Sequence, residues 1–117
     1  MKVLGVFARF YVNDMDEAIN YYENLLGEKI SNRFYVSEIN LEVARINNIL
    51  IVAGKEEYLS EYRKTYATFL VDSINDFKSY LEDKAEIIRG PQKVPTGYNM
   101  TVKNPDGVII EYVEFAK

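Results

Sequence analysis

The chain has 117 residues, of which 48% are hydrophobic and 27% are charged, which is typical of one folded domain with a real core. Its formal net charge of −4 argues against nucleic acids and anionic membranes as partners, because both require a concentrated basic surface. Disulfides and thiolate chemistry are excluded because there is no cysteine. Histidine, the commonest metal ligand and general base, is also missing.

No stretch of the sequence is apolar enough to span a bilayer or to act as a signal peptide. We therefore expect a cytoplasmic protein.

A strand and an amphipathic helix are predicted at the start of the chain. Residues 3–12 alternate, with Arg9 among aromatic residues on one face, as on a ligand-facing surface. Asp14 is the expected N-cap of a helix over residues 15–26, and Gly27 is its expected end. The opposite strand face is apolar and is expected to pack on a helix; it consists of Leu4, Val6, Ala8, Phe10 and Val12.

Three short strands are predicted next, over residues 29–36, 39–46 and 49–53. They are rich in branched and aromatic residues and follow one another closely, which favours an antiparallel meander. The charged segment 55–64 then has apolar residues at the spacing of a helical turn, and we interpret it as a connector.

The same pattern begins again after the connector. Residues 65–71 repeat the first strand, and Ser73 repeats the N-cap in front of a second amphipathic helix. An alignment without gaps matches Phe7 with Tyr66 and Phe10 with Phe69. The remaining predicted elements are strands over 85–89, 98–103 and 108–115, with a loop over 90–97. The order of strand, helix and three strands is therefore written twice in an α+β chain.

The last strand carries one acidic residue among apolar ones. Residues 104–107 read Asn-Pro-Asp-Gly, a tight turn that reverses the chain before this strand. Glu111 lies within the strand, where a carboxylate needs a partner, a metal or water. Glu111 is therefore the first candidate for a functional residue.

Three motifs in this order resemble those of the vicinal-oxygen-chelate superfamily, which includes glyoxalase I, extradiol dioxygenases and bleomycin-resistance proteins. The resemblance covers essentially the whole chain. It implies two tandem βαβββ modules, about 1–54 and 65–117, with curved mixed sheets forming a cup and helices on the outer face. It also implies a homodimer. The motifs are Phe10-Tyr11-Val12-Asn13-Asp14 running into Ala18-Ile19-Asn20-Tyr21-Tyr22 and Leu25-Leu26-Gly27, then Tyr66-Ala67-Thr68-Phe69-Leu70-Val71-Asp72, and finally Asn104-Pro105-Asp106-Gly107 with Ile110-Glu111.

In the metal-using relatives, the first and last strands of each module donate the metal ligands. The resemblance places three of these positions on Phe7, Tyr66 and Glu111, and the fourth near Ile51 or Val52. Only Glu111 is a conventional ligand, whereas a catalytic transition-metal site needs about three. We therefore expect neither a metal nor another cofactor.

The interpretation that remains is a metal-free protein that binds a small aromatic or cationic compound, to sequester or to sense it, as in the bleomycin-resistance branch. Tyr11, Phe34 and Tyr35 would extend an aromatic lining around Glu111. The expected ligand-binding residues are Phe7, Arg9, Tyr66, Tyr98, Met100 and Glu111.

Two structural alternatives stand beside this interpretation. Phe7 and Tyr66 would fill the vacated cavity as core residues, and Arg9 and Glu111 would form an internal ion pair. The functional alternative is a lyase, isomerase or dioxygenase-like enzyme that uses Glu111 as a metal ligand or general base.

Overall fold

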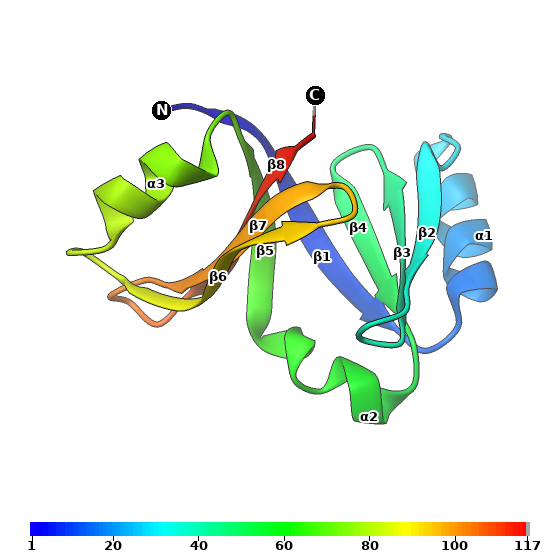
Figure 1. The fold of residues 1–117 in the computed structure, drawn as a ribbon. Helices are drawn as coiled ribbons and strands as arrows, with labels where there is room; N and C mark the ends of the chain where they lie inside the picture. The colour runs from blue at the N-terminus through cyan, green and yellow to red at the C-terminus, as the bar shows by residue number, and fades with distance from the viewer. Residues whose placement is uncertain (117) are drawn as a thin grey trace. The chain divides into compact units, whose positions relative to one another are not determined.

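The computed structural model describes residues 1–116, which form two compact units (Figure 1). The N-terminal unit is Ala8–Lys64, and the C-terminal unit combines Met1–Phe7 with the chain from Thr65 onward. Strand β1 (Val3–Val12) therefore contributes to both units. Within the described residues, no helix is long and apolar enough to cross a membrane.

The N-terminal unit is a mixed sheet with the strand order β2-β3-β4-β1. Its further strands are β2 (Asn32–Val36), β3 (Leu41–Ile46) and β4 (Ile49–Ala53). Strands β2, β3 and β4 pair antiparallel, which confirms the predicted meander, and β4 pairs parallel with β1.

Helix α1 (Met15–Leu26) has the predicted bounds and packs on one face of this sheet. Its start is fixed because the Asp14 side chain accepts a hydrogen bond of 3.0 Å from the Glu17 backbone N–H. Its end is fixed by Gly27, whose φ of 68° is left-handed. The helix buries Met15, Ala18 and Ile19 against strand residues that include Ala44, Ile46 and Ile51.

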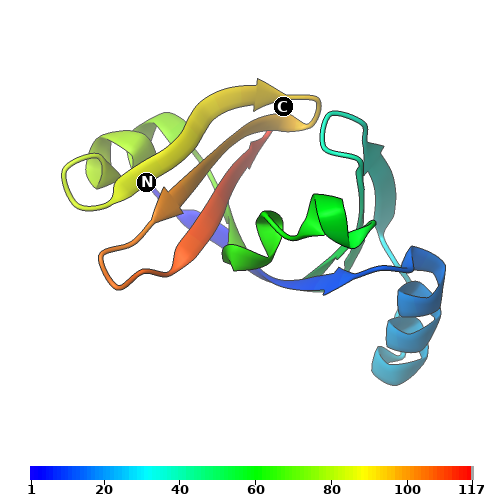
Figure 2. The same cartoon turned by 90° about the horizontal axis from the view of Figure 1, so that it is seen from below.

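The opposite face of the N-terminal sheet is covered by the connector. This segment forms α2 (Glu56–Leu59) and the 3₁₀ turn η1 (Tyr62–Lys64), so the helical turn expected over 55–64 is confirmed. Leu59 is fully buried against Leu41 and Val52. Figure 2 shows α1 and α2 on opposite sides of the strands.

The C-terminal unit repeats this architecture. Its strands β5 and β8 pair parallel, while β8 with β7 and β7 with β6 pair antiparallel. The pairing is the same as that of β1, β4, β3 and β2, which confirms the duplicated βαβββ order. The elements are β5 (Thr65–Val71), α3 (Ile74–Leu81), β6 (Glu86–Val94), β7 (Gly97–Lys103) and β8 (Ile109–Phe115).

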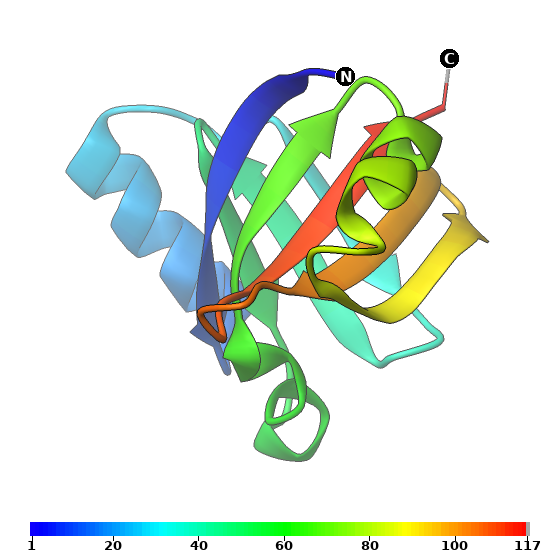
Figure 3. The same ribbon diagram turned by 90° about the vertical axis from the view of Figure 1, so that its left-hand side faces the viewer.

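Helix α3 covers one face of the C-terminal sheet (Figure 3). The predicted cap is present, because the Ser73 hydroxyl accepts a hydrogen bond of 3.2 Å from the Asp76 backbone N–H. Beneath the helix lies a core of buried residues, which are Val71, Ile74, Phe77, Met100, Val102, Ile110 and Tyr112.

Two expectations from the sequence are wrong. Residues 90–97 are not a loop, because β6 runs on to Val94; the register shift between Arg89 and Gln92 accommodates Gly90 and Pro91 within the strand. The apolar face of β1 packs on a helix only near its end, where Phe10 contacts the Tyr22 ring with centroids 5.2 Å apart. Leu4 and Val6 are 55% and 52% exposed.

Candidate functional site

The orientation of Glu111 follows from its two neighbours in β8. Ile110 and Tyr112 are buried in the core beneath α3. Because successive side chains of a strand point to opposite faces, Glu111 projects from the face of the C-terminal sheet that α3 does not cover. This surface is called the Glu111 face below.

A row of polar residues crosses four neighbouring strands on the Glu111 face. In the strand register Glu111 lies opposite Thr68 of β5 on one side and Thr101 of β7 on the other, and Thr101 lies opposite Arg89 of β6. The Thr68 hydroxyl donates a hydrogen bond of 2.8 Å to Oε1 of Glu111. Thr68 is 1% exposed, so this donor is held firmly in place. The carboxylate is therefore anchored by a buried hydroxyl.

Phe7 lies on the same face. Its ring atoms are 3.6 and 3.7 Å from the position that a Cβ on Gly5 would occupy, and Cβ of Leu70 is 3.9 Å from it. Leu70 alternates with the core residues Phe69 and Val71, so it shares the Glu111 face with Thr68. Phe7 is 3% exposed and supplies an apolar, aromatic floor.

The other residues predicted in the C-terminal unit lie elsewhere. Tyr66 is the extra residue where the register between β5 and β8 shifts, and its side chain is 67% exposed. Met100 is fully buried beneath α3. Tyr98 lies opposite Glu114, whose carboxylate accepts a hydrogen bond from the Ile74 N–H at the start of α3. Tyr98 and Met100 thus lie on the face away from Glu111.

Arg9 belongs to the N-terminal unit, where it contacts Tyr11. Its Nε donates a hydrogen bond of 2.6 Å to the Tyr11 hydroxyl, and its guanidinium carbon is 5.4 Å from the centroid of that ring. Arg63 approaches the same ring at 6.0 Å. Tyr11 is therefore held by two cationic side chains.

The residues at the positions that the resemblance assigns to metal ligands do not fit a transition metal. Phe7 has no donor atom, Tyr66 is displaced by the register shift, and Glu111 is bonded to a threonine hydroxyl. Leu50 of β4 is the N-terminal counterpart of Glu111. It lies opposite Arg9 of β1, just as Glu111 lies opposite Thr68 of β5. Within residues 1–116, no three His, Cys, Asp or Glu side chains gather closely enough to hold a metal.

A cavity of about 460 Å³ lies in the N-terminal unit. None of the predicted ligand-binding residues lines it, although Tyr35, expected to extend the aromatic lining, does. Its residues come from separate segments that only the folded chain brings together, so no local sequence pattern could have identified it. They are Asn13, Met15, Tyr35, Asn40, Glu42, Ala53, Gly54, Lys55 and Tyr58.

Comparison with protein families identifies the class of this protein. The model of the Glyoxalase/Bleomycin resistance protein/Dioxygenase superfamily matches residues 4–112. The chain therefore belongs to this superfamily. No curated protein matches it significantly.

Solved structures share the fold over nearly the full chain. An uncharacterized protein from Methanosarcina mazei is 49% identical, with a TM-score of 0.88 over 100% of this chain and 96% of that one. Methylmalonyl-CoA epimerase from Mycobacterium tuberculosis is 18% identical, with a TM-score of 0.81 over 98% and 90% of the two chains. A hypothetical protein from Bacillus halodurans is 16% identical, with a TM-score of 0.74 over 99% and 95%. The last two show a common fold only.

The hydrogen bond between Thr68 and Glu111 can be tested by Thr68→Val, which keeps the shape of the side chain but removes the hydroxyl. We expect the free energy of unfolding to fall by about 1.5–3 kcal/mol, because a hydrogen bond to a charged group is lost. Urea denaturation at neutral pH measures this change. Thr68→Ser, which keeps the hydroxyl, serves as the control. A valine variant at least as stable as the serine variant would show that the hydroxyl does not anchor Glu111.

Proposed function

We propose that the protein binds a small aromatic or cationic molecule on the Glu111 face without a metal, to sequester or to sense it. The observation that carries this proposal is the environment of Glu111. The carboxylate lies beside the Thr68 hydroxyl and on the same face as the aromatic Phe7, where metal-using relatives would need further ligands.

The composition of the Glu111 face supports an organic cation or a planar molecule with hydrogen-bond donors as the ligand. Phe7 and Leu70 supply apolar surface, and Glu111 supplies a negatively charged carboxylate that the Thr68 hydroxyl orients. Aromatic faces attract cations, and a carboxylate adds directional hydrogen bonding. Arg89, two strands from Glu111 in the register, adds a positively charged residue to the same face.

A second candidate function comes from the epimerase structures that share the fold. One of them was solved in complex with methylmalonyl-CoA and NH4+, and it is 15% identical with a TM-score of 0.79 over 98% of this chain. An enzyme acting on an acyl thioester would use Glu111 for proton transfer. An acyl-CoA therefore belongs among the compounds tested, and its turnover would favour this candidate.

Ligand binding is tested by thermal unfolding in the presence of EDTA with aromatic amines and quaternary ammonium compounds. A ligand at a hundred times its Kd stabilises the folded protein by about 2.7 kcal/mol, which raises the Tm by several degrees. We expect the Glu111→Gln variant to need at least about ten times more ligand for the same rise in Tm. The exposed Glu82→Gln variant is expected to respond as the wild type does. No stabilisation by any of these compounds would contradict the proposal, as would a shift that appears only after metal is added.

We also propose that two copies of the chain pair as a homodimer. Leu4 and Val6 are neighbours on one face of β1 and are 55% and 52% exposed. An exposed apolar strip on a strand is a feature of association surfaces, because burying it removes apolar area from water. A twofold dimer presents the same strip from both copies.

Sedimentation equilibrium tests the dimer. Val6→Glu places a charge on the exposed strip and is expected to convert the dimer into a monomer with unchanged circular dichroism. Lys78→Glu, at an exposed position of α3, is the control and is expected to leave the dimer intact. A wild-type chain that sediments as a monomer at tens of micromolar would contradict the proposal.

A further inference from the structure

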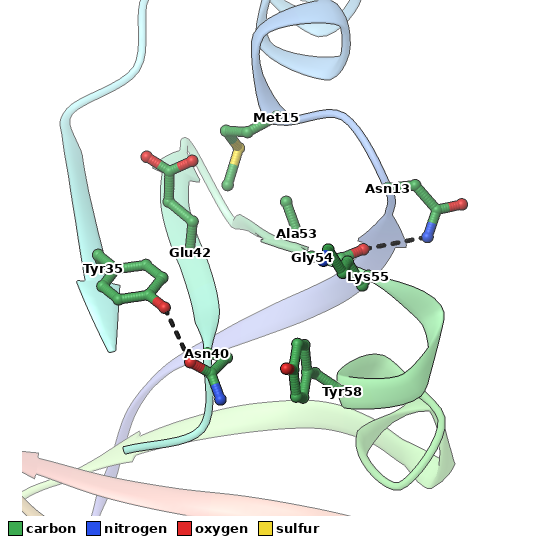
Figure 4. Close-up of a pocket in the computed structure, with 9 residues that line it drawn as sticks. All are labelled: Asn13, Met15, Tyr35, Asn40, Glu42, Ala53, Gly54, Lys55 and Tyr58. Carbon is green, nitrogen blue, oxygen red and sulfur yellow. Dashed lines mark hydrogen bonds between the residues drawn. The ribbon is translucent and has the colours of Figure 1, made fainter. Parts of the chain in front are cut away.

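The cavity of the N-terminal unit combines apolar walls with charged groups that belong to different segments (Figure 4). Tyr35 of β2 and Tyr58 of α2 face it with aromatic rings, and Met15 and Ala53 add apolar surface. Its volume of about 460 Å³ is within the range of small-molecule sites. Aromatic walls with a few fixed polar groups are the usual composition of such sites.

Glu42 gives the cavity a carboxylate of fixed orientation. Nε and Nη2 of Arg33 donate hydrogen bonds of 2.5 and 3.2 Å to the two Glu42 oxygens. Nη1 of Arg33 donates a bond of 2.8 Å to Asp16 at the start of α1. The two carboxylates raise the pKa of Arg33, chiefly through the hydrogen bonds with Glu42, so the guanidinium stays charged.

The charges of Arg33, Glu42 and Asp16 do not cancel. One guanidinium and two carboxylates leave a net charge of −1 next to the cavity. Each Glu42 oxygen accepts a single bond from Arg33 and has a further lone pair for a ligand. This wall therefore favours a cationic hydrogen-bond donor such as an ammonium group.

Other residues of the lining supply donors and a positive charge. Lys55 is one of the lining residues and carries a positive charge, and its neighbour Glu56 is paired with Arg63 at 2.7 Å. The side-chain oxygen Oδ1 of Asn40 accepts a hydrogen bond of 3.1 Å from the Tyr35 hydroxyl, which leaves the side-chain nitrogen Nδ2 directed to other partners. In the view of Figure 4, the side chains of Asn40 and Tyr58, which carry this nitrogen and a hydroxyl, lie below Glu42. Both groups are hydrogen-bond donors.

We propose that this cavity is a second ligand site, lined only by the N-terminal unit, which takes a small zwitterion of the amino-acid type. The ammonium of the ligand bonds to Glu42, its carboxylate meets Lys55, and its apolar body lies against Tyr35 and Tyr58. Both charges of the ligand contribute to its affinity, which distinguishes this site from one for a simple cation or anion.

Three compounds that share a phenyl ring test this assignment by ¹H–¹⁵N chemical-shift titration of the whole chain. They are phenylalanine, phenethylamine, which has only the ammonium, and 3-phenylpropionate, which has only the carboxylate. We expect phenylalanine to shift the amides of Asn40, Gly54 and Lys55 with a saturating curve. Each singly charged analogue is expected to bind about tenfold more weakly or less, because one charged hydrogen bond is missing.

Variants assign each charge to its residue. Lys55→Gln is expected to weaken binding of phenylalanine and 3-phenylpropionate about tenfold and to leave phenethylamine unchanged, and Glu42→Gln is expected to act in the reverse way. Exposed Glu57→Gln, next to the lining but outside it, is the matched control. The Glu42→Gln variant loses contacts with Arg33 and would be uninformative if it failed to fold. Lys55 is exposed, so the Lys55→Gln variant is expected to fold and still tests the proposal.

The proposal is overturned if millimolar phenylalanine shifts none of the three amides, if all three compounds bind equally, or if Lys55→Gln leaves the affinity for phenylalanine unchanged. Glu111→Gln is expected to have no effect on this titration. The result therefore stands apart from the test of the Glu111 face.

Discussion

The alternation of side chains along β8 is the constraint on which the proposed site depends. Ile110 and Tyr112 are committed to the core beneath α3, so Glu111 must point the other way. A shift by one residue would bury the carboxylate under the helix and expose two large apolar side chains. The parallel pairing with β5 then brings the buried Thr68 hydroxyl to 2.8 Å from the carboxylate. Packing on one face of the sheet thus decides the chemistry on the other.

Duplication supplied two equivalent positions, and the two copies have diverged at them. Glu111 and Thr68 of the C-terminal unit correspond in strand pairing to Leu50 and Arg9 of the N-terminal unit. In the N-terminal copy Arg9 turns to Tyr11, and the sheet face opposite α1 is covered by the connector through Leu59. The N-terminal unit has its cavity at Glu42 instead. Two copies of one architecture therefore present two different polar groups.

The sequence predicted those features that a local pattern determines. Helix α1 was predicted residue for residue, because Asp14 and Gly27 act on neighbouring backbone. For strand β6 the sequence predicts an end at Arg89, because a proline inside a strand is tolerated only through a register shift that the partner strand defines. Residue type groups Tyr98 and Met100 with Glu111, whereas the pairing of β7 with β8 assigns them to the α3 face. The cavity at Glu42 depends on long-range contacts, among them the pairing of Arg33 with Asp16, and could not be predicted.

In the proposed function, Glu111 anchors an organic ligand and does not bind a metal. Anomalous diffraction from crystals soaked in Mn²⁺, Ni²⁺ or Zn²⁺ tests it most directly, because a bound transition metal lies about 2.0–2.3 Å from its ligand atoms. We predict no anomalous peak at that distance from the Glu111 carboxylate in any of the three soaks. A peak coordinated by Glu111 and two further side chains of the protein would contradict this proposal.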